Sequence, residues 1–255
     1  MPSFDGQHPG LAPYTRWLGA DRCPGLSALN GFARDCALAL PDGRPLAFVA
    51  ARGGLRALDY ERAIAGRGEI ATREGNLHDA FNALAWLCFP RTKAALNAVH
   101  VQSAAAGTAN ARDRARDAAT LLDESGLLLG CADSRLAALL RERAWRELFW
   151  MRRDEVVRGM RPLVLGHGLA EKLESPYRAL TAHVLLLDLP LAHVAAAGSA
   201  DGVLDVIAAA LIAAPGFGPD RLTPLPVAAL PGWDAEGLGE SLFDDLSVFR
   251  APVLR

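Results

Sequence analysis

Residues 76–100 read NLHDAFNALAWLCFPRTKAALNAVH and decide how the middle of the chain folds. In the first half of this stretch, apolar side chains recur every three to four residues, which predicts an α-helix over residues 76–89. The apolar stripe of that helix consists of Leu77, Phe81, Leu84 and Cys88. Pro90 ends the pattern because proline lacks the N–H that a helix interior requires. A second helix is predicted over residues 92–102, and we expect the two to form a helical hairpin.

The composition is that of a globular protein. Of the 255 residues, 51% are hydrophobic and 22% are charged, so we expect a single domain with a substantial core. Within it we expect a wrapping N-terminal segment over residues 1–70, a core over 71–214 and a packed, extended, proline-rich tail over 215–255. The formal net charge of -2 provides no global attraction for nucleic acid, although a local patch is not excluded.

The cysteines and the apolar segments indicate the compartment. The four cysteines are far apart and form no CxxC pair, which favours reduced thiols over a disulfide framework. The N-terminus lacks the basic and apolar regions of a signal peptide. Residues 203–214 are strongly apolar but carry Asp205 and are shorter than the ~20 residues of a membrane helix. Arginine outnumbers lysine heavily, as in proteins from GC-rich genomes, so we expect a bacterial, cytoplasmic protein without membrane association.

Short apolar runs and turn-forming residues predict the remaining elements. In residues 120–129, Asp123, Glu124 and a Ser-Gly pair separate two apolar runs, which is typical of a β-hairpin. Helices are expected over 134–150, 166–173 and 201–214, and strands over 45–50 and 162–165; residues 181–187 are either a strand or a buried helix. The expected fold class is therefore α+β: a mostly helical single domain with a helical hairpin, a β-hairpin, a small sheet and an extended C-terminal tail.

Polar side chains follow one edge of each helix in the predicted hairpin. At 100° per residue, His78 and Asn82 share the edge of the first helix, and Lys93, Asn97 and His100 share one face of the second. An antiparallel arrangement would bring the two sets together as a site for an anion or for acid–base chemistry. The competing interpretation is an ordinary solvated helix face.

Two further segments carry candidate ligand-binding groups. Arg112 and Arg116 lie one turn apart and could clamp a phosphate or carboxylate, unless they belong to a solvated charged helix. The acidic pair at the predicted hairpin turn, Asp123 and Glu124, could ligate a hard cation, although turn chemistry alone explains it.

The segment Gly166-His-Gly168 begins a third polar group. His167 and Glu171 are four residues apart, the spacing that lets two side chains share a metal or a substrate, and Lys172 follows directly. The pattern is much weaker than HExxH, so a divalent metal is only a candidate cofactor. Lys93 and Lys172 are the only lysines in the chain, which could mark places that need a compact ammonium group.

Several common enzyme classes lack their motifs here. The sequence contains no GxSxG elbow, no Walker loop and no dinucleotide-binding fingerprint. This argues against the usual serine hydrolases, P-loop NTPases and Rossmann dehydrogenases.

Residues 76–100 also resemble the signature of a bacterial family classified as domain of unknown function 3025. The resemblance continues through residues 116–126, 166–172 and 224–233, and so spans most of the chain. It implies no catalytic residue and no ligand, because the family has no assigned activity. It does imply that the polar groups described above lie inside the family's signature segments.

The leading hypothesis is an enzyme with a cleft that acts on a small anionic substrate, and a hydrolase is the suggested class. The candidate catalytic residues are His78, Asp79, Asn82, His100, His167 and Glu171. The candidate substrate-binding residues are Lys93, Asn97, Arg112, Arg116 and Lys172. The candidate metal ligands are His167, Glu171, Asp123 and Glu124.

Two other functions remain open at this stage: a non-catalytic module that binds a phosphate-bearing ligand or nucleic acid, and a structural interaction protein. Spatial convergence separates the three. An enzyme needs His78, His100 and His167 around one pocket, a binding module needs converging cations without a base, and an interaction protein would scatter the imidazoles and expose an apolar patch.

Overall fold

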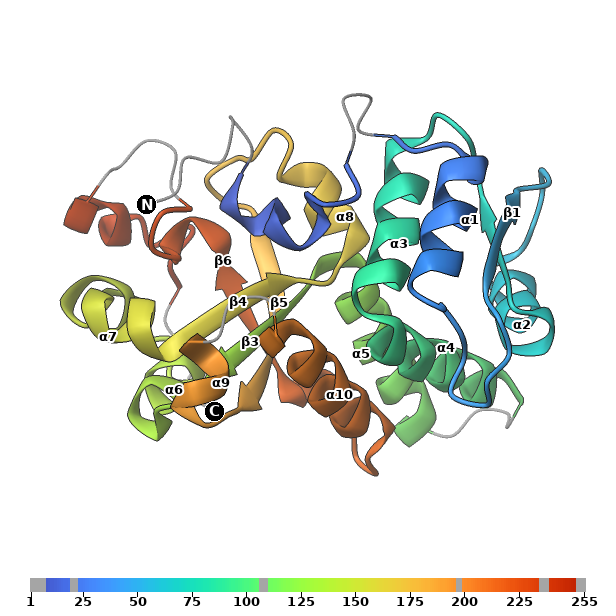
Figure 1. Ribbon diagram of the computed structural model, residues 1–255. Coiled ribbons are helices and arrows are strands. Elements are labelled where there is room, and N and C mark those ends of the chain that lie inside the picture. The colour runs from blue at the N-terminus through green and yellow to red at the C-terminus, as the bar shows by residue number, and fades with distance from the viewer. Residues whose placement is uncertain (1–7, 19–22, 106–109, 196–198, 234–238, 251–255) are drawn as a thin grey trace.

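The computed structural model describes residues 8–18, 23–105, 110–195, 199–233 and 239–250, and its elements are drawn in Figure 1. The helices of the described residues are α1 (Leu26–Asp35), α2 (Ala57–Arg67), α3 (Leu77–Cys88), α4 (Pro90–Ala105), α5 (Asn110–Ser125), α6 (Ser134–Arg141), α7 (Arg153–Gly159), α8 (His167–Lys172), α9 (Leu191–Ala195) and α10 (Ser199–Ala213). Short 3-10 or π turns are η1 (Pro9–Tyr14), η2 (Glu147–Met151), η3 (Pro219–Arg221), η4 (Val227–Ala229) and η5 (Gly239–Asp244). The strands are β1 (Ala47–Ala50), β2 (Glu69–Thr72), β3 (Gly126–Cys131), β4 (Met160–Val164), β5 (Thr181–Asp188) and β6 (Leu222–Pro226). The chain is thus a mostly helical α+β protein, as its sequence predicts.

The larger sheet has the strand order β4-β3-β5-β6. Strand β3 is parallel to β5 and antiparallel to β4, and all six of its residues are buried. A strand covered on both faces favours the unbroken apolar sequence GLLLGC that β3 has. Pro224 and Pro226 lie in β6 at the sheet edge, where the missing proline N–H costs no internal ladder bond.

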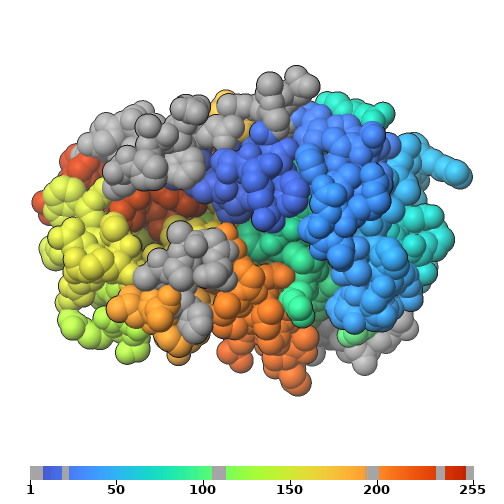
Figure 2. Space-filling model, viewed as in Figure 1, coloured from blue at the N-terminus to red at the C-terminus, as the bar shows by residue number. Residues whose placement is uncertain are grey.

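The molecule has a sheet half and a helical half. Figure 1 shows the four-stranded sheet with α6, α7 and α9 on one side, and α1 to α4 with the parallel pair β1-β2 on the other. Helices α5, α8 and α10 lie between them. In Figure 2 the N-terminal segment at residues 8–18 crosses the middle of the same face. Tyr14 fixes this segment, because its hydroxyl donates to the carbonyl of Val164 at 2.7 Å.

The two helices of the predicted hairpin are present, with Phe89 alone between them. Figure 1 shows them meeting at a corner instead of lying antiparallel, because a single residue cannot reverse the chain. Asn76 caps the start of α3 by accepting from the Asp79 N–H. The start of α4 is capped from another helix: the buried carboxylate of Asp205 in α10 accepts from two α4 backbone N–H groups, at 3.0 and 2.8 Å.

The β-hairpin predicted over residues 120–129 is wrong. Helix α5 continues to Ser125, whose hydroxyl donates to the Leu121 carbonyl one turn earlier, and strand β3 begins at the next residue, Gly126. A side chain at Gly126 would collide with the Leu122 carbonyl. The helix and the strand therefore follow each other directly, and the apolar pair before the acidic residues belongs to a helix face.

The single helix predicted over residues 134–150 is divided. Helix α6 ends at Arg141, and Arg143 adopts a left-handed backbone conformation with φ of 52°. The chain then forms the short π turn η2. The predicted strands at 45–50 and 162–165 are present as β1 and β4, and residues 181–188 form strand β5, not a helix.

The described residues of the proline-rich tail contribute to the core and to the larger sheet. Trp233, Phe243 and Phe249 are all buried, and the tail supplies the edge strand β6. Within the described ranges, no helix combines the length and the apolar character that crossing a membrane requires.

Candidate functional site

Strand pairing brings together two segments that carry titratable side chains, at one end of the larger sheet. Asp123 and Glu124 lie just before β3 and His167 just after β4, and these strands are antiparallel neighbours in which Leu127 pairs with Val164. The start of one strand therefore meets the end of the other. The N–H groups of residues 165 and 166 both donate to the Gly126 carbonyl, at 3.0 and 2.9 Å, and fix the junction.

Two glycines permit the close approach of α8 to α5. A side chain at Gly166 would lie 2.6 Å from the Ser125 nitrogen, and one at Gly168 would lie 2.8 Å from Oε2 of Glu124. Such separations are too short for non-bonded carbon. The backbone of the Gly-His-Gly segment therefore lies close to the end of α5, and this places the His167 ring beside it.

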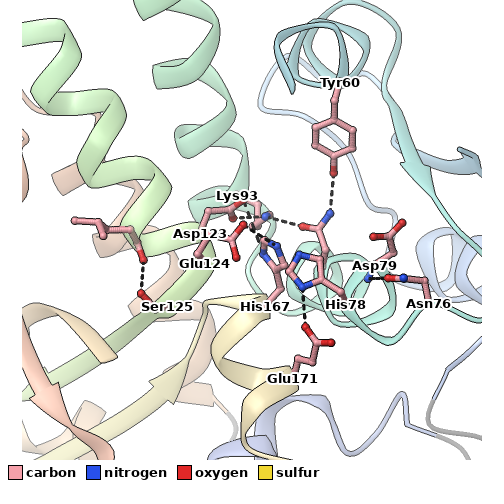
Figure 3. A network of polar contacts seen from close by, with 12 residues as sticks. Tyr60, Asn76, His78, Asp79, Lys93, Asp123, Glu124, Ser125, His167 and Glu171 are labelled. Atoms are coloured by element: carbon pink, nitrogen blue, oxygen red, sulfur yellow. Dashed lines mark hydrogen bonds and ion pairs between the residues drawn. The ribbon is translucent and has the colours of Figure 1, made fainter. Parts of the chain in front are cut away.

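Helix α3 brings a second imidazole to the same place. The rings of His78 and His167 meet edge to face, with centroids 4.4 Å apart. Figure 3 shows these two histidines between Glu171 on one side and the acidic pair of α5 on the other. Segments almost ninety residues apart in sequence thus share one cluster.

Carboxylates surround the two imidazoles. Nδ1 of His78 lies 2.8 Å from Oε2 of Glu171, and because a carboxylate only accepts, this nitrogen carries the proton. His167 is buried, with its Nε2 3.6 Å from Oε1 of Glu124 and its Nδ1 3.9 Å from Oδ2 of Asp123. One donor atom from each of His78, Glu124 and His167 lies within 4.8 Å of the others. This is the donor set that could hold a metal.

A buried ammonium group supports the cluster. The side chain of Lys93 is only 4% exposed, pairs with Asp123 and donates to Oδ1 of Asn82 at 2.9 Å. The Asn82 amide in turn donates to the hydroxyl of Tyr60 at 2.8 Å. The chain of contacts visible in Figure 3 therefore runs from α2 through α3 and α4 to α5. It holds Asp123 in place beside His167.

The charges in this network shift two pKa values. Burial works to raise the pKa of the Asp123 carboxyl, but the charges of Lys93 and His167 outweigh it, so the pKa lies below its ordinary 3.8. Burial is also the main cause that lowers the pKa of His167; the Lys93 charge acts in the same direction, against Asp123 and Glu124. At neutral pH the Asp123 carboxylate is charged and the His167 imidazole is neutral.

A cleft of about 440 Å³ opens beside the cluster, between α2, α4 and α5. Its charged and titratable lining residues are Glu61, His100, Arg116, Asp123 and Glu124. Glu124 therefore borders both the cleft and the imidazole pair.

Burial displaces the pKa values of two groups in the cleft from their ordinary values. Burial raises the pKa of Glu61 to about 7, against the hydrogen bond that Asn97 Nδ2 donates to its carboxylate at 2.6 Å. Burial also lowers the pKa of His100, with Lys93 and Arg116 acting in the same direction and Asp123 against them. Clefts that hold such perturbed groups are typical of enzyme active sites.

The structure assembles most of the residues singled out from the sequence. Seven belong to the imidazole cluster and its supporting network: His78, Asn82, Lys93, Asp123, Glu124, His167 and Glu171. Three others belong to the cleft or its wall: Asn97, His100 and Arg116.

Two predicted residues, Asp79 and Lys172, are not brought to the cluster. The Asp79 carboxylate faces away and binds Arg73 through both its backbone and its guanidinium group, at 2.7 to 2.9 Å. Lys172 is exposed on the last turn of α8. The side chain of Arg112 lies outside the described part of the structure.

Two residues of α2 were missed by the sequence analysis. Tyr60 and Glu61 come from a segment assigned only to a wrapping arm, and both reach the site. The signal that could have revealed them is their spacing from the buried Ile64, since residues three and four before a core position share its helix face.

The chain was compared with known proteins. No curated protein and no solved structure matches it. A family model described as "Protein of unknown function (DUF3025)" matches residues 46–252. That range contains every cluster and cleft residue described above, and the chain accordingly belongs to the DUF3025 family.

Proposed function

We propose that this protein is an enzyme, a hydrolase that acts on a small anionic substrate bound in the cleft between α2, α4 and α5. The observation that supports this proposal is the pairing, in one cleft, of a carboxyl group whose pKa is raised to about 7 and an imidazole whose pKa is lowered below its ordinary 6.5, so that it is neutral at pH 7. Groups that titrate near the working pH are the most effective acid–base catalysts.

The chemistry assigns each group a role. His100 is neutral at pH 7, because burial lowers its pKa, and it acts as the base that takes a proton from the attacking water. Glu61, with a pKa of about 7, is substantially protonated and donates a proton to the leaving group. Asn97 orients the Glu61 carboxyl by donating a hydrogen bond to Oε2.

Arg116 is the group proposed to bind the anionic part of the substrate. Its guanidinium lines the cleft, is exposed, and makes one long ion pair of 3.7 Å with Asp113 on the same helix. A guanidinium fork matches phosphate and carboxylate groups in a bidentate manner.

The distribution of cations favours an enzyme over a non-catalytic binding module. Such a module would direct several free cations at one ligand, whereas Lys93 is neutralised by Asp123 and Lys172 is exposed on a different helix. The imidazoles are also not scattered, since His78 and His167 are in contact and His100 lines the adjoining cleft.

We propose the cytoplasm as the compartment in which the protein works. All four cysteines are free thiols. Their state suits a reducing environment.

The proposal is tested with chromogenic aryl phosphate esters as substrates. We expect wild-type protein to hydrolyse a p-nitrophenyl phosphate monoester or diester, and His100→Gln and Glu61→Gln each to lower kcat/KM by about 10²- to 10⁴-fold. His183→Gln and Glu69→Gln are the matched controls, because both residues lie outside the cleft.

The proposal is rejected if wild-type protein hydrolyses neither ester, or if the two cleft variants keep the wild-type rate. Equal losses in the cleft variants and the controls would also count against it, since they would point to a general effect of substitution.

A further inference from the structure

Beyond the cleft, we propose that His78, His167 and Glu124 bind a divalent transition-metal ion. The donor atoms assigned are Nε2 of each imidazole and the Glu124 carboxylate. Binding of the ion does not depend on the hydrolysis proposed above. A catalytic role for the ion does rest on that proposed function.

The spacing of the donors fits an ion. With bonds of about 2.0 to 2.1 Å, two ligand atoms around a tetrahedral zinc lie about 3.4 Å apart. The separation between Nε2 of His167 and Oε1 of Glu124 is 3.6 Å, and all three donors lie within 4.8 Å of one another. A side-chain adjustment of the order of 1 Å therefore brings the three donors to bonding distance.

Each imidazole has a carboxylate behind it. Metal-bound histidines usually present their second nitrogen to a carboxylate, which fixes the tautomer and orients the ring. Glu171 occupies that position for His78, at 2.8 Å from Nδ1. Asp123 stands on the corresponding side of His167, 3.9 Å from an Nδ1 that is buried and has no hydrogen-bond partner.

The charge around the imidazoles also favours a dication. Asp123, Glu124 and Glu171 are three carboxylates, and the ammonium of Lys93 neutralises one of them. Two negative charges remain beside two imidazoles, which matches the charge of one divalent ion. A merely structural histidine pair would not need this surplus.

The donor atoms indicate which metal ions the site would bind and whether it would be structural or catalytic. Two imidazole nitrogens with one carboxylate favour zinc, manganese, iron or cobalt over magnesium and calcium, which prefer oxygen ligands. Three protein ligands leave further coordination positions open, as in catalytic sites. Because Glu124 also lines the cleft, we infer that the open positions face the substrate.

Gly168 is part of the proposed site although it supplies no ligand. Its missing side chain leaves room for the Glu124 carboxylate, which would otherwise meet a methyl group at 2.8 Å. The Gly-His-Gly segment thus delivers one ligand and makes space for another.

The inference is tested by titrating chelator-treated, metal-free protein with Zn²⁺ and Co²⁺, with calorimetry and the cobalt absorption spectrum as readouts. We expect one ion per chain. His78→Gln, His167→Gln and Glu124→Gln should each weaken binding more than 100-fold, and Glu171→Gln should weaken it by about 10- to 100-fold. His183→Gln serves as the matched control and should bind as wild type does.

Circular dichroism establishes that each variant is folded. Glu171 is the more accessible of the two carboxylates behind the imidazoles, with its side chain 40% exposed. If the variants at buried positions do not fold, the metal affinity of Glu171→Gln therefore decides whether the site exists. The inference is overturned if wild-type protein takes up no ion, or if Glu171→Gln and His183→Gln bind it equally well.

Failure of this inference and failure of the proposed function are distinguishable. Glu61→Gln and His100→Gln should lose hydrolysis and keep the full complement of metal. A wild-type protein that takes up no ion in the titration and still hydrolyses the esters would overturn the metal site alone.

Discussion

Replacement of Glu61 by glutamine should make the protein more stable at neutral pH. The pKa of this carboxyl rises from 4.5 in the unfolded chain to about 7 in the fold, chiefly because it is buried. The folded state therefore retains a proton that the unfolded chain has already lost. The contribution of this carboxyl to stability is fully present below pH 4.5 and is lost as the pH rises from 4.5 to about 7.

The size of the effect follows from the two pKa values. Each pH unit between them lowers the free energy of unfolding by about 1.4 kcal/mol, which amounts to about 3 kcal/mol over the whole interval. Glutamine imitates the protonated carboxyl and still accepts the hydrogen bond from Asn97. Glu61→Gln should therefore match wild type at pH 4.5 and exceed its stability by about 3 kcal/mol at pH 8.

Guanidinium denaturation of wild type and Glu61→Gln at pH 4.5, 6, 7 and 8 measures this difference. Glu69→Gln is the control, because Glu69 makes a surface ion pair with Arg67. The reasoning is refuted if the stabilities of wild type and Glu61→Gln stay parallel across this pH range. A stabilising change that abolishes activity would be the usual cost of a functional group held in an unfavourable state.

Three further predictions concern the stability of the fold, and each is measured by chemical denaturation at pH 7. Lys93→Met should cost about 3 to 5 kcal/mol because it leaves the Asp123 carboxylate unpaired, and Asp123→Asn in the same chain should restore most of the loss. Gly168→Ala should cost about 1 to 3 kcal/mol, since the added methyl would lie 2.8 Å from Oε2 of Glu124. Asp205→Ala should cost about 1 to 3 kcal/mol, because two backbone N–H groups at the start of α4 lose their acceptor.

Simple outcomes contradict these three predictions. A double variant no more stable than Lys93→Met would exclude the buried pair as the cause of the loss. Gly202→Ala is the control for the glycine change, since a methyl group there meets nothing within 4 Å and should stabilise α10 by up to about 1 kcal/mol. If Gly168→Ala behaves as Gly202→Ala does, the close approach of α8 to α5 is wrong. An unchanged stability in Asp205→Ala would show that α4 does not depend on the cap from α10.

Local patterns predicted the helices around residue 90 and the pairing of their polar faces. Lys93 and Asn82 do form a hydrogen bond, as their helical phases indicate, although the helices meet at a corner. The short apolar runs at β1 and β4 were also recognised as strands. The run at β5 was left open between a strand and a buried helix, because a short apolar run is compatible with both. These features depend on residues close in sequence.

The end of α5 was not predictable from turn chemistry. Asp123, Glu124 and Ser125 are common in turns, but the tertiary position of Leu122 in the core, and the bond from Ser125 back to Leu121, keep them helical. Local preference and helical packing conflict here, and packing decides.

The sequence did not predict that the site residues meet in space. It only indicated that an enzyme would require them to meet. His167 reaches Glu124 because β3 and β4 are neighbours and because Gly166 and Gly168 let α8 approach α5 closely. It reaches His78 because α8 also packs against α3. Strand order is set by long-range pairing, which a single sequence does not express. The same reason explains why Glu61 was missed: α2 contributes to the cleft only through its packing in the finished fold.

The central claim is that His78, His167 and Glu124 form one metal-binding cluster at the edge of a catalytic cleft. Anomalous diffraction at the zinc edge, from crystals grown with one equivalent of Zn²⁺, tests it most directly. The account predicts one strong peak, about 2.0 to 2.2 Å from the two imidazole nitrogens and from a Glu124 oxygen. A zinc ion bound elsewhere, or imidazoles of His78 and His167 that point to separate surfaces, would contradict it.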